Sequence, residues 1–466
     1  MIGDERKNLL IIIFTLLGAY LLTLLPLPDA FSSDAVTMMA IALVGAVFWI
    51  TECIPISLTA LVVILLQAVT GIIHISDGLG YIATPVNSII FAGFIMAAAL
   101  SKYDLDRRIG LMIVGAMGEK ADRLLLGIMV ATGFLSMWIS NSAATAIMLP
   151  IAIGIMKMDE SIAPGASNLG RAMTIGIAYA ANIGGMGTPA GTPASSLTIA
   201  FINDLLGVEL GFLDWFIRAA PVVVLLIPLA WKVLLVVYPP EKQNIEGGAE
   251  AVQEELAHMG PLTPKQKHVY ILFAMALILW TADSFLELMP GWLFIASVLI
   301  SLLFLSPVVG VVKWKEASPQ IGWGIFILVG GGLALGSGLV ETGVVEVIAE
   351  HLYHVLSGAG VLFSITLLAF VTAMSITFFS SLTATSTTFV PIAVGLGQQL
   401  GMNPILMGIV AGLSSCMAFL LPANTPPNAI TYASGYFKSY EMTKVGLVLT
   451  VASVLVLSIF ANIMWF

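Results

Sequence analysis

Small polar side chains gather at two places in a chain that is otherwise strongly apolar. The first place reads SNSAAT from Ser140 to Thr145, and the second reads SLTATSTT from Ser381 to Thr388. Downstream of each stands a polar segment with proline, GTPASS in the first case and NTPPNA in the second. Hydroxyl and carbonyl oxygens suit hard cations, and backbone amides freed where a helix is interrupted bind anions. These residues could therefore hold an anion together with a cation.

The same segments carry no fixed charge. No Lys or Arg occurs between Arg171 and Arg218 or between Lys315 and Lys438, and both polar clusters and both proline segments lack Asp and Glu. A dianion in a low-dielectric site is costly without a counter-charge, so we expect mobile cations, sodium in the first instance, to enter with it. The missing carboxylates argue against a proton relay or a carrier of multivalent metal ions.

The composition indicates that lipid surrounds most of the chain. Of 466 residues, 59% are hydrophobic and only 10% are charged, and the mean hydropathy is +1.03, whereas a soluble domain carries about 25% charged residues. This excludes a water-soluble enzyme, a nucleic-acid-binding protein and a disordered chain. Apolar runs of about 18 to 25 residues recur and can cross a bilayer as helices. We therefore predict an all-α polytopic membrane protein.

The apolar runs predict about eleven transmembrane helices and two further regions, 123–157 and 359–400, that look like pairs of half-length helices. With a cytoplasmic N-terminus and both regions treated as re-entrant hairpins, every Lys and Arg except Arg218 lies inside, as the positive-inside rule requires. The first run lacks a small-residue cleavage site, so we expect a retained helix. The chain is expected in the cytoplasmic (inner) membrane of a prokaryote. The predicted spans are 8–25, 35–52, 55–73, 87–102, 172–204, 214–238, 268–286, 291–306, 322–341, 404–437 and 442–465.

The sequence repeats itself in opposite orientations. Pro150 in the first hairpin region aligns with Pro391 in the second, GTPASS aligns with NTPPNA, and the segment around Gly93 aligns with that around Gly331. The predicted topology starts one copy from outside and the other from inside, so the repeat is inverted. Inverted repeats with interrupted helices are typical of secondary transporters, because backbone groups freed in a broken helix survive in a membrane only where they line a polar cavity.

The repeat predicts a division of the chain into five parts. The linker between the two copies is polar (QNIEGGAEAVQEELAH), and we predict no chemistry for it. The expected parts are scaffold helices in 1–86, a first repeat in 87–238 with a hairpin at 123–157 and a broken helix at 172–204, a cytoplasmic linker in 239–266, scaffold helices in 267–321, and a second repeat in 322–466 with a hairpin at 359–400 and a broken helix at 404–437.

These motifs together resemble one family. SNS at Ser140–Ser142, SLT at Ser381–Thr383, NTPPNA, and ITECIP at Ile50–Pro55 are similar, in order and over nearly the whole chain, to motifs of the divalent anion–sodium symporter family. The resemblance implies import of a small dicarboxylate of the succinate, malate or fumarate type, coupled to two or more sodium ions. It also implies a homodimer in the bilayer, with a transport domain that moves against a scaffold in an elevator-like way. No nucleic-acid partner is expected.

The resemblance also assigns residues by position. It gives one sodium site to each hairpin and lets both hairpins contact the substrate. The substrate contacts carried over are Asn141, Ser142, Thr192, Pro193, Thr383, Asn424, Thr425 and Pro426. The sodium ligands carried over are Ser136, Ser140, Asn141, Gly187 and Gly191 for the first site, and Thr377, Ser380, Ser381, Thr383, Ala423 and Asn424 for the second.

Three positions depart from the family pattern. Leu382 stands where the second hairpin motif has Asn, and Asn424 stands where a small residue usually precedes Thr-Pro-Pro. We hypothesise that Asn424 restores, from the facing segment, the amide that is missing at Leu382. In the first copy Ser195 is shorter than the Asn expected there, which widens the pocket or changes its hydrogen bonds.

Four other functions are alternatives to sodium-coupled import. A sodium-independent dicarboxylate exchanger of the same fold would accommodate the altered second motif, and a sulfate or other inorganic divalent anion symporter is a further alternative. A membrane-embedded enzyme needs a nucleophile with a base, or facing carboxylates or histidines. The polar clusters contain no such pair, so we predict that the protein is not an enzyme. A channel is less favoured, because inverted hairpins that close one compact site indicate occlusion.

Overall fold

The computed structural model describes residues 2–24, 31–159, 161–245, 247–286, 289, 291–356 and 358–465. Every regular element in these ranges is a helix, as predicted for an all-α polytopic membrane protein. Residue 25, the predicted end of the first span, lies outside the described residues. The elements that precede the first repeat are α1 (Ile2–Thr23), α2 (Ser33–Thr51), α3 (Ile56–Thr70), α4 (Ile75–Gly80) and η1 (Tyr81–Ala83).

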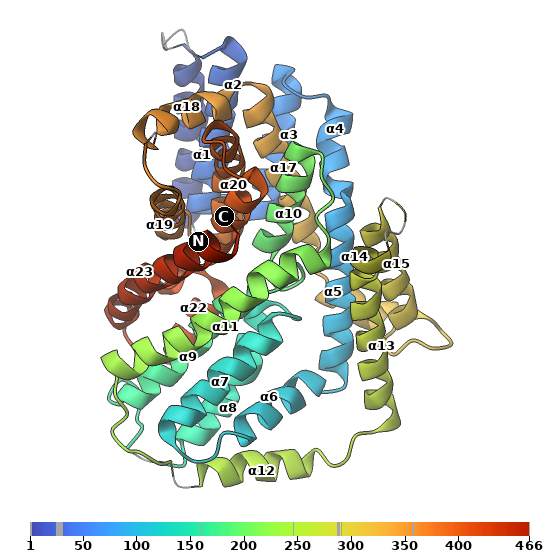
Figure 1. Ribbon diagram of the computed structural model, residues 1–466, viewed down its shortest axis with the longest axis vertical. Coiled ribbons are helices and arrows are strands. Elements are labelled where there is room, and N and C mark those ends of the chain that lie inside the picture. Colours follow the sequence, from blue (N-terminus) through green and yellow to red (C-terminus); the bar gives the residue numbers. More distant parts are fainter. Residues whose placement is uncertain are drawn as a thin grey trace.

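Two sets of seven helices occupy the regions of the predicted repeats (Figure 1). The first set is α5 (Pro85–Lys102), α6 (Leu105–Gly115), α7 (Ala121–Ser136), α8 (Asn141–Met156), α9 (Asn168–Gly185), α10 (Pro193–Leu206) and α11 (Phe212–Val237). The second set, which also contains the short η3 (Pro422–Asn424), is α17 (Trp323–Glu341), α18 (Val344–Leu356), α19 (Val361–Phe379), α20 (Leu382–Gln399), α21 (Pro404–Ser414), α22 (Pro426–Ala433) and α23 (Ser439–Met464).

The segment between the two sets begins with the predicted linker. It is not extended: it folds into a helix that lies across the bottom of the molecule in Figure 1 and packs on α6 and α8. The helices of this segment are α12 (Gly248–His258), α13 (Pro264–Thr281), α14 (Asp283–Leu286), α15 (Trp292–Leu305), α16 (Trp314–Ala317) and η2 (Ser318–Gln320).

Among the described residues, seven stretches are long and apolar enough to cross a membrane; one of them, Ile75–Lys102, is made of α4, η1 and α5 in succession. Of the other predicted spans, those at α3 and α15 are shorter, the two broken helices are interrupted, and α13 has 18 residues but carries Lys265 and Lys267 in its first turn. The hairpin arms are predicted as half-length helices, and this is wrong: α7 and α8 have 16 residues each, α20 has 18 and α19 has 19. Of the four, α19 is also apolar enough to span. The seven stretches are Glu5–Thr23, Ser33–Thr51, Ile75–Lys102, Phe212–Val237, Trp323–Glu341, Val361–Phe379 and Ser439–Met464.

Both hairpin regions fold as helix pairs joined by a short turn, four residues (Met137–Ser140) in the first and two serines (Ser380 and Ser381) in the second. The turn between α7 and α8 ends at Ser140, whose hydroxyl accepts the amide of Ala143 at 3.2 Å. The turn between α19 and α20 ends at Ser381, whose hydroxyl accepts the amide of Ala384 at 3.3 Å. Serine is a preferred N-cap because its side chain satisfies an amide that the helix leaves unpaired, so each hairpin starts its second arm at a capping serine.

The two predicted broken helices are interrupted where the proline segments lie. In the first copy α9 ends at Gly185 and α10 begins at Pro193, and in the second copy α21 ends at Ser414 and α22 begins at Pro426. Proline is suited to the first position of a helix, where the missing N–H costs nothing. The chain therefore stops one helix and starts another inside the membrane.

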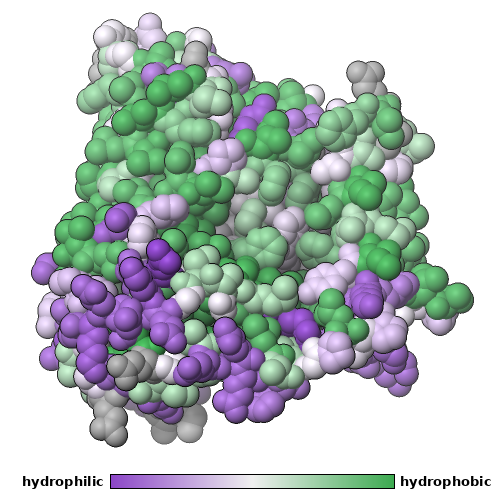
Figure 2. Space-filling model, turned by 60° about the horizontal axis from the view of Figure 1, so that its bottom comes forward, coloured by the Kyte–Doolittle hydropathy of each residue, from purple (hydrophilic) through white to green (hydrophobic). Residues whose placement is uncertain are grey.

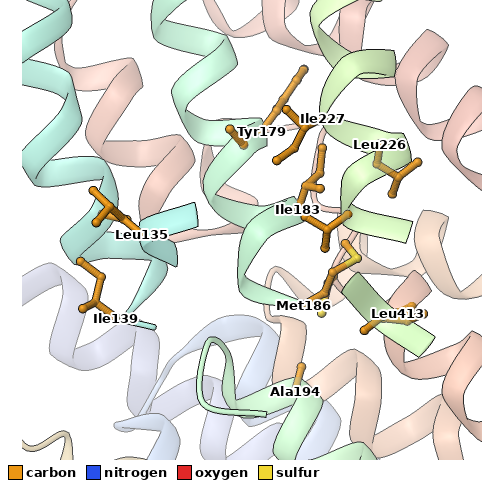
Figure 3. Close-up of a cluster of buried hydrophobic side chains, with 14 of the residues drawn as sticks. Leu135, Ile139, Tyr179, Ile183, Met186, Ala194, Leu226, Ile227 and Leu413 are labelled. Atoms are coloured by element: carbon orange, nitrogen blue, oxygen red, sulfur yellow. The ribbon is translucent and has the colours of Figure 1, made fainter. Parts of the chain in front are cut away.

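The two copies interlock. Within each copy the first hairpin arm packs on the first half of the broken helix, α7 on α9 and α19 on α21. Between copies the second hairpin arm packs on the second half of the other broken helix, α8 on α22 and α20 on α10. Figure 3 shows the apolar packing around the first break, with Ile183 and Met186 from the end of α9 and Ala194 from the start of α10. This interlocking brings the starts of α8 and α22, and those of α10 and α20, next to one another in pairs of packed helices.

Candidate functional site

The first hairpin tip concentrates oxygen atoms around one hydroxyl group. The Oγ of Ser136, at the end of α7, lies 2.7 Å from Oδ1 of Asn141 and 2.8 Å from the carbonyl oxygen of Ala181. Ser136 is fully buried, and Asn141 is 9% exposed. One hydroxyl proton can serve only one of the two acceptors at a time. The cluster therefore has more acceptors than donors, which favours a cation.

Close backbone contacts hold the first break against this tip. A Cβ atom on Gly185 would lie 2.1 Å from Oδ1 of Asn141, and one on Gly191 would lie 2.4 Å from the carbonyl oxygen of Gly185. Gly191 therefore requires glycine, because backbone atoms stand in the way, whereas a side chain at Gly185 would have to displace the carboxamide of Asn141. In the described chain no hydrogen bond reaches the carbonyl oxygen of Gly185, because the residue four positions later is Pro189, which has no N–H. The break thus presents a free carbonyl beside the hairpin tip.

A small cavity of about 40 Å³ borders the first set of predicted residues. Ser140 from the hairpin and Gly191, Thr192 and Pro193 from the break line it, opposite residues of α5 and α17. Thr188 fixes the break by donating its hydroxyl to the carbonyl oxygen of Met137, and its Oγ1 accepts the amide of Gly191 at 3.1 Å. Four residues carried over from the family are thus brought to one surface.

The second hairpin tip is built differently. Ser380 lies in the left-handed region, with φ of 48°, and ends α19 in a tight turn. Such a backbone is uncommon for a residue other than glycine. The buried Oγ1 of Thr377 has no hydrogen-bond partner among the described residues. Leu382 occupies the place of Asn141, so the second tip lacks the side-chain acceptor that the first tip has.

Asn424 supplies a carboxamide to the second tip from the broken helix. Its Nδ2 donates to the carbonyl oxygen of Ile376 at 3.1 Å, and its Oδ1 accepts the amide of Leu421 at 2.8 Å. The side chain is 1% exposed. Thr425 follows and caps α22, since its Oγ1 accepts the amide of Asn428 at 3.5 Å. The hairpin and the break of the second copy are therefore joined by an amide, as the hypothesis for Asn424 requires.

Sequence reasoning missed a pair of amides that connects the two copies. Nδ2 of Asn182 donates to Oδ1 of Asn428 at 3.0 Å, and both side chains donate to the carbonyl oxygen of Ala418. Asn428 also donates to the carbonyl oxygen of Leu421 at 2.9 Å. Both asparagines are fully buried. The pair gives the carbonyls of the second break the donors that the broken helix cannot provide.

The corresponding place in the first break has hydroxyl groups instead. Aligning the two proline segments sets Ser195 on Asn428 and Ser415 on Asn182. Helices α10 and α21 bring these serines to the same level, since Gly412 packs on Thr198 and Gly408 packs on Ile202 one turn further. Ser195 is fully buried and its Oγ has no hydrogen-bond partner in the described chain. The first break is thus less well supplied with donors than the second.

Four helices, α8, α10, α20 and α22, begin at the hairpin tips and breaks. A helix start presents unpaired amides and a positive dipole end. The N-terminal turns of α10 and α20 contact each other directly, because Oγ of Ser386 lies 3.0 Å from Oγ1 of Thr198 and 3.3 Å from the carbonyl oxygen of Ala194. No Lys or Arg belongs to any of the four helices. Any attraction for an anion must come from amides, dipoles and bound cations.

The structure brings together the predicted residues within each copy. No hydrogen bond in the described ranges joins a predicted residue of the first copy to one of the second. Near the breaks the copies are joined through Ser386, the Asn182–Asn428 pair and the hydroxyl of Tyr179, which donates to the carbonyl oxygens of Phe419 and Met442. Of the predicted residues with side chains, Ser136, Asn141, Thr192, Thr383, Asn424 and Thr425 are buried, Ser142, Pro193, Thr377, Ser380 and Ser381 are partly exposed, and Ser140, Ala423 and Pro426 are exposed. The backbone positions Gly187 and Gly191 are buried.

This architecture defines the class as a polytopic membrane transporter, because paired hairpins and broken helices in inverted copies build the binding sites of secondary transporters. The particular family follows from the comparison of sequences. Residues 5–466 match the family described as the sodium:sulfate symporter transmembrane region, and the chain belongs to that family.

Named transporters are similar in sequence to this protein over most of its length. The sodium-dependent dicarboxylate transporter SdcS of Staphylococcus saprophyticus is 33% identical over 459 residues, which cover 94% of this chain and 88% of SdcS. The SdcS protein of Staphylococcus aureus is 33% identical over 469 residues with the same coverage. Among solved structures, the YdaH transporter of Alcanivorax borkumensis aligns with a TM-score of 0.56 over 84% of this chain and 87% of YdaH, at 12% identity. That likeness supports the fold alone.

Proposed function

We propose that the protein imports small dicarboxylates together with sodium ions. The observation that carries the proposal is a binding region with four helix starts and unpaired oxygen atoms but no Lys or Arg. Without a fixed positive charge, a dianion would pay a large desolvation cost in the protein interior. Sodium ions beside the hairpin tips would lower that cost. The names of the SdcS relatives, which describe sodium-dependent dicarboxylate transport, point the same way.

We assign the first sodium site to the oxygen cluster of the first hairpin and break. Ser136, Ser140 and Asn141 would supply side-chain oxygens, and the backbone near Gly187 and Gly191 would supply carbonyls. This assignment is supported by the surplus of acceptors around the Ser136 hydroxyl. A cation there would satisfy oxygen atoms that lack donors.

We assign the second sodium site to the second hairpin and break. Its side-chain ligands would be Thr377, Ser380, Ser381 and Thr383, with the backbone near Ala423 and Asn424. The unpaired hydroxyl of Thr377 supports this. Because Leu382 cannot act as a ligand, the carboxamide of Asn424 would organise the site by holding the end of α19. The number of sodium ions per cycle is proposed to be two or more.

The substrate would lie between the two tips. One carboxylate would meet Asn141, Ser142 and the start of α10 at Thr192 and Pro193. The other would meet Thr383 and the start of α22, with Asn424, Thr425 and Pro426. Helix starts at both ends match the two negative ends of a dicarboxylate.

The scaffold and transport domains, the elevator-like movement, the homodimer and the cytoplasmic N-terminus belong to the same proposal. The interlocked contacts of α8 with α22 and of α20 with α10 support a compact body that carries the site as one unit. We propose the same five-part division of the chain into scaffold helices, two repeats and a linker. The positive-inside distribution of Lys and Arg supports the orientation.

Uptake into liposomes tests the function. Purified protein should accumulate labelled succinate when sodium is high outside, and uptake should fall to background when choline replaces sodium. Equal uptake in choline would favour the alternative of sodium-independent exchange. Because the family description names sulfate, competition by unlabelled sulfate tests the inorganic anion alternative in the same assay.

A further inference from the structure

An open groove of about 820 Å³ lies away from the broken helices, where the end of α5 meets the start of α13 and the loop after α15. We call it the lysine groove after the basic residues that line it, Lys102, Lys265, His268 and Lys313. No Asp or Glu is among its lining residues. The groove therefore presents positive charge without a carboxylate directly in it.

The loop that forms one wall of the groove is held firmly. The amide of Gly310 donates to the carbonyl oxygen of Ser306 at 2.9 Å, and that of Val311 donates to Phe304 at 2.9 Å. Residues of the opposite wall bind the same loop. The hydroxyl of Tyr103 donates to the carbonyl oxygen of Val311 at 2.9 Å, and Nε2 of His268 lies 2.6 Å from the carbonyl oxygen of Val309. A preformed wall lowers the ordering cost of binding a ligand.

Among the described residues, one of the three lysines of the groove forms an ion pair. Nζ of Lys102 lies 2.6 Å from Oε2 of Glu316, which also accepts the amide of Lys313 at 2.8 Å. The ammonium of Lys102 holds the pKa of Glu316 below its usual range, so that carboxylate stays ionised and paired. Lys265 and Lys313 are exposed and form no ion pair in the described ranges. Two positive charges thus remain available for an external anion.

The rim of the groove is apolar and exposed. Val308 is 88% exposed and Trp314 is 47% exposed. Further along the two helices that frame the groove, Ile271 on α13 and Leu302 on α15 are 56% and 60% exposed. Exposed aliphatic side chains on a membrane helix face lipid, and tryptophan concentrates at the level of the headgroups. The charged groove therefore lies next to surfaces suited to acyl chains. Figure 2 shows the same pattern on the wider surface, with hydrophilic residues along the bottom and apolar residues over the sides.

We propose that the lysine groove binds the phosphate-bearing headgroup of an anionic phospholipid, with its acyl chains lying along α13 and α15. Basic pockets between membrane helices on the cytoplasmic side bind such headgroups. The loop of residues 306–312 and the exposed Trp314 fix the depth at which the phosphate meets Lys265 and Lys313. This assignment does not rest on the proposed transport function, because the groove shares no residue with the hairpin tips or breaks.

Lipid titration followed by native mass spectrometry tests the site. Full-length protein in neutral detergent is titrated with phosphatidylglycerol or with phosphatidylcholine of the same acyl chains. Each lysine near an anionic headgroup changes affinity about five-fold, so Lys265→Gln/Lys313→Gln should bind phosphatidylglycerol about thirty-fold more weakly. Lys265→Arg/Lys313→Arg should retain binding. Lys157→Gln/Lys444→Gln, which removes two exposed lysines elsewhere, is the matched control and should bind like wild type.

Three outcomes would overturn the proposal. Phosphatidylglycerol bound equally well by the Lys265→Gln/Lys313→Gln protein would show that the groove is not the site. An equal loss in the control would mean that overall charge, and not the groove, attracts the lipid. Competition by millimolar inorganic phosphate to the same extent as by added phosphatidylglycerol would assign the groove to a small free anion. A succinate uptake assay run in parallel reports on transport separately.

Discussion

The two breaks share one architecture but differ in where their hydrogen-bond donors come from. In the first copy the hairpin provides Asn141, the hydroxyl of Ser195 has no partner, and the carbonyl of Gly185 receives no hydrogen bond in the described chain. In the second copy Leu382 provides no polar group, and amides from the break, Asn424 and Asn428, serve the carbonyls around it. The side-chain amide therefore belongs to the hairpin in the first copy and to the break in the second.

The difference indicates that the two proposed cation sites need not be equivalent. A site with spare acceptors gains most from a cation, because unpaired buried oxygen atoms are costly. A site whose carbonyls already receive amide protons gains less. We therefore expect the first site to dominate sodium binding and the second to act mainly through the position of its helices.

The largest effect is expected from making the first tip resemble the second. Asn141→Leu removes the acceptor beside Ser136 and should lower sodium-dependent succinate uptake by about 100-fold, because losing a buried polar contact of about 3 kcal/mol changes binding by that factor. Uptake over a range of sodium concentrations measures this. Folded protein is verified by its thermal unfolding in detergent, and wild-type sodium dependence in Asn141→Leu would refute the ranking of the sites.

The next largest effect concerns the amide at Asn424. Asn424→Ala should weaken apparent sodium affinity about tenfold, since the hydrogen bond to Ile376 at the end of α19, of about 1.4 kcal/mol, is lost; the second lost bond, from the amide of Leu421, lies within the break. Adding Leu382→Asn to this variant should restore most of the affinity if the two positions supply the same amide. Unchanged sodium dependence in Asn424→Ala, or no rescue in the double variant, would refute the hypothesis that Asn424 supplies the amide missing at Leu382.

A smaller effect, on stability, follows from exchanging the junction residues. Asn428→Ser leaves the carbonyl oxygen of Leu421 without its side-chain donor and should lower the free energy of unfolding by about 1–3 kcal/mol. The reverse change, Ser195→Asn, should be neutral or stabilising by up to about 1 kcal/mol, because the alignment sets Gly185 on Ala418, whose carbonyl Asn428 serves in the second copy, and we expect the new amide to serve Gly185 in the same way. Thermal unfolding of both variants in detergent checks the comparison, and destabilisation by Ser195→Asn alone would contradict it.

The smallest effect concerns the linker. In the described ranges, the side-chain hydrogen bonds and ion pairs of residues 239–260 go to the first copy. Lys242 lies 2.7 Å from Asp159 and, with Ser161, lowers the pKa of that carboxyl to about 2. A lowered pKa contributes stability above the unfolded value near 4, and this contribution is lost as the pH falls from about 4 to about 2. Because Lys242 is largely exposed, we expect no more than about 0.5 kcal/mol. Comparing the acid unfolding of wild type and Asp159→Asn measures this contribution to the free energy of unfolding. A larger difference would show that the linker stabilises the first copy substantially.

Much of this fold follows from local sequence. Ser140 and Ser381 predict the starts of the second hairpin arms, and Pro193 and Pro426 predict the starts of the second half-helices, because capping and proline geometry depend on neighbouring residues. The alignment of Pro150 with Pro391 also predicted that the two hairpins correspond. These signals require no knowledge of distant contacts.

The partners of the polar residues could not be read in the same way. Asn182 and Asn428 are 246 positions apart, and their pairing depends on how α9 and α22 cross. The attachment of α12 to α6 and α8 likewise depends on tertiary packing, which a polar linker sequence does not specify. One signal was present: the aligned proline segments place a serine in one copy where the other has an asparagine, and this asymmetry marked the junction.

Pro193 and Pro426 each open a half-helix inside the membrane. A proline within a continuous helix loses a hydrogen bond and clashes with the preceding turn, at a cost of about 3 kcal/mol or more. Joining the gaps ahead of α10 and α22 into continuous helices would incur this cost at each break. We therefore expect the breaks to persist during turnover, and the proposed binding site to reach each side of the bilayer by displacement of the body that carries it, not by winding and unwinding of its own backbone.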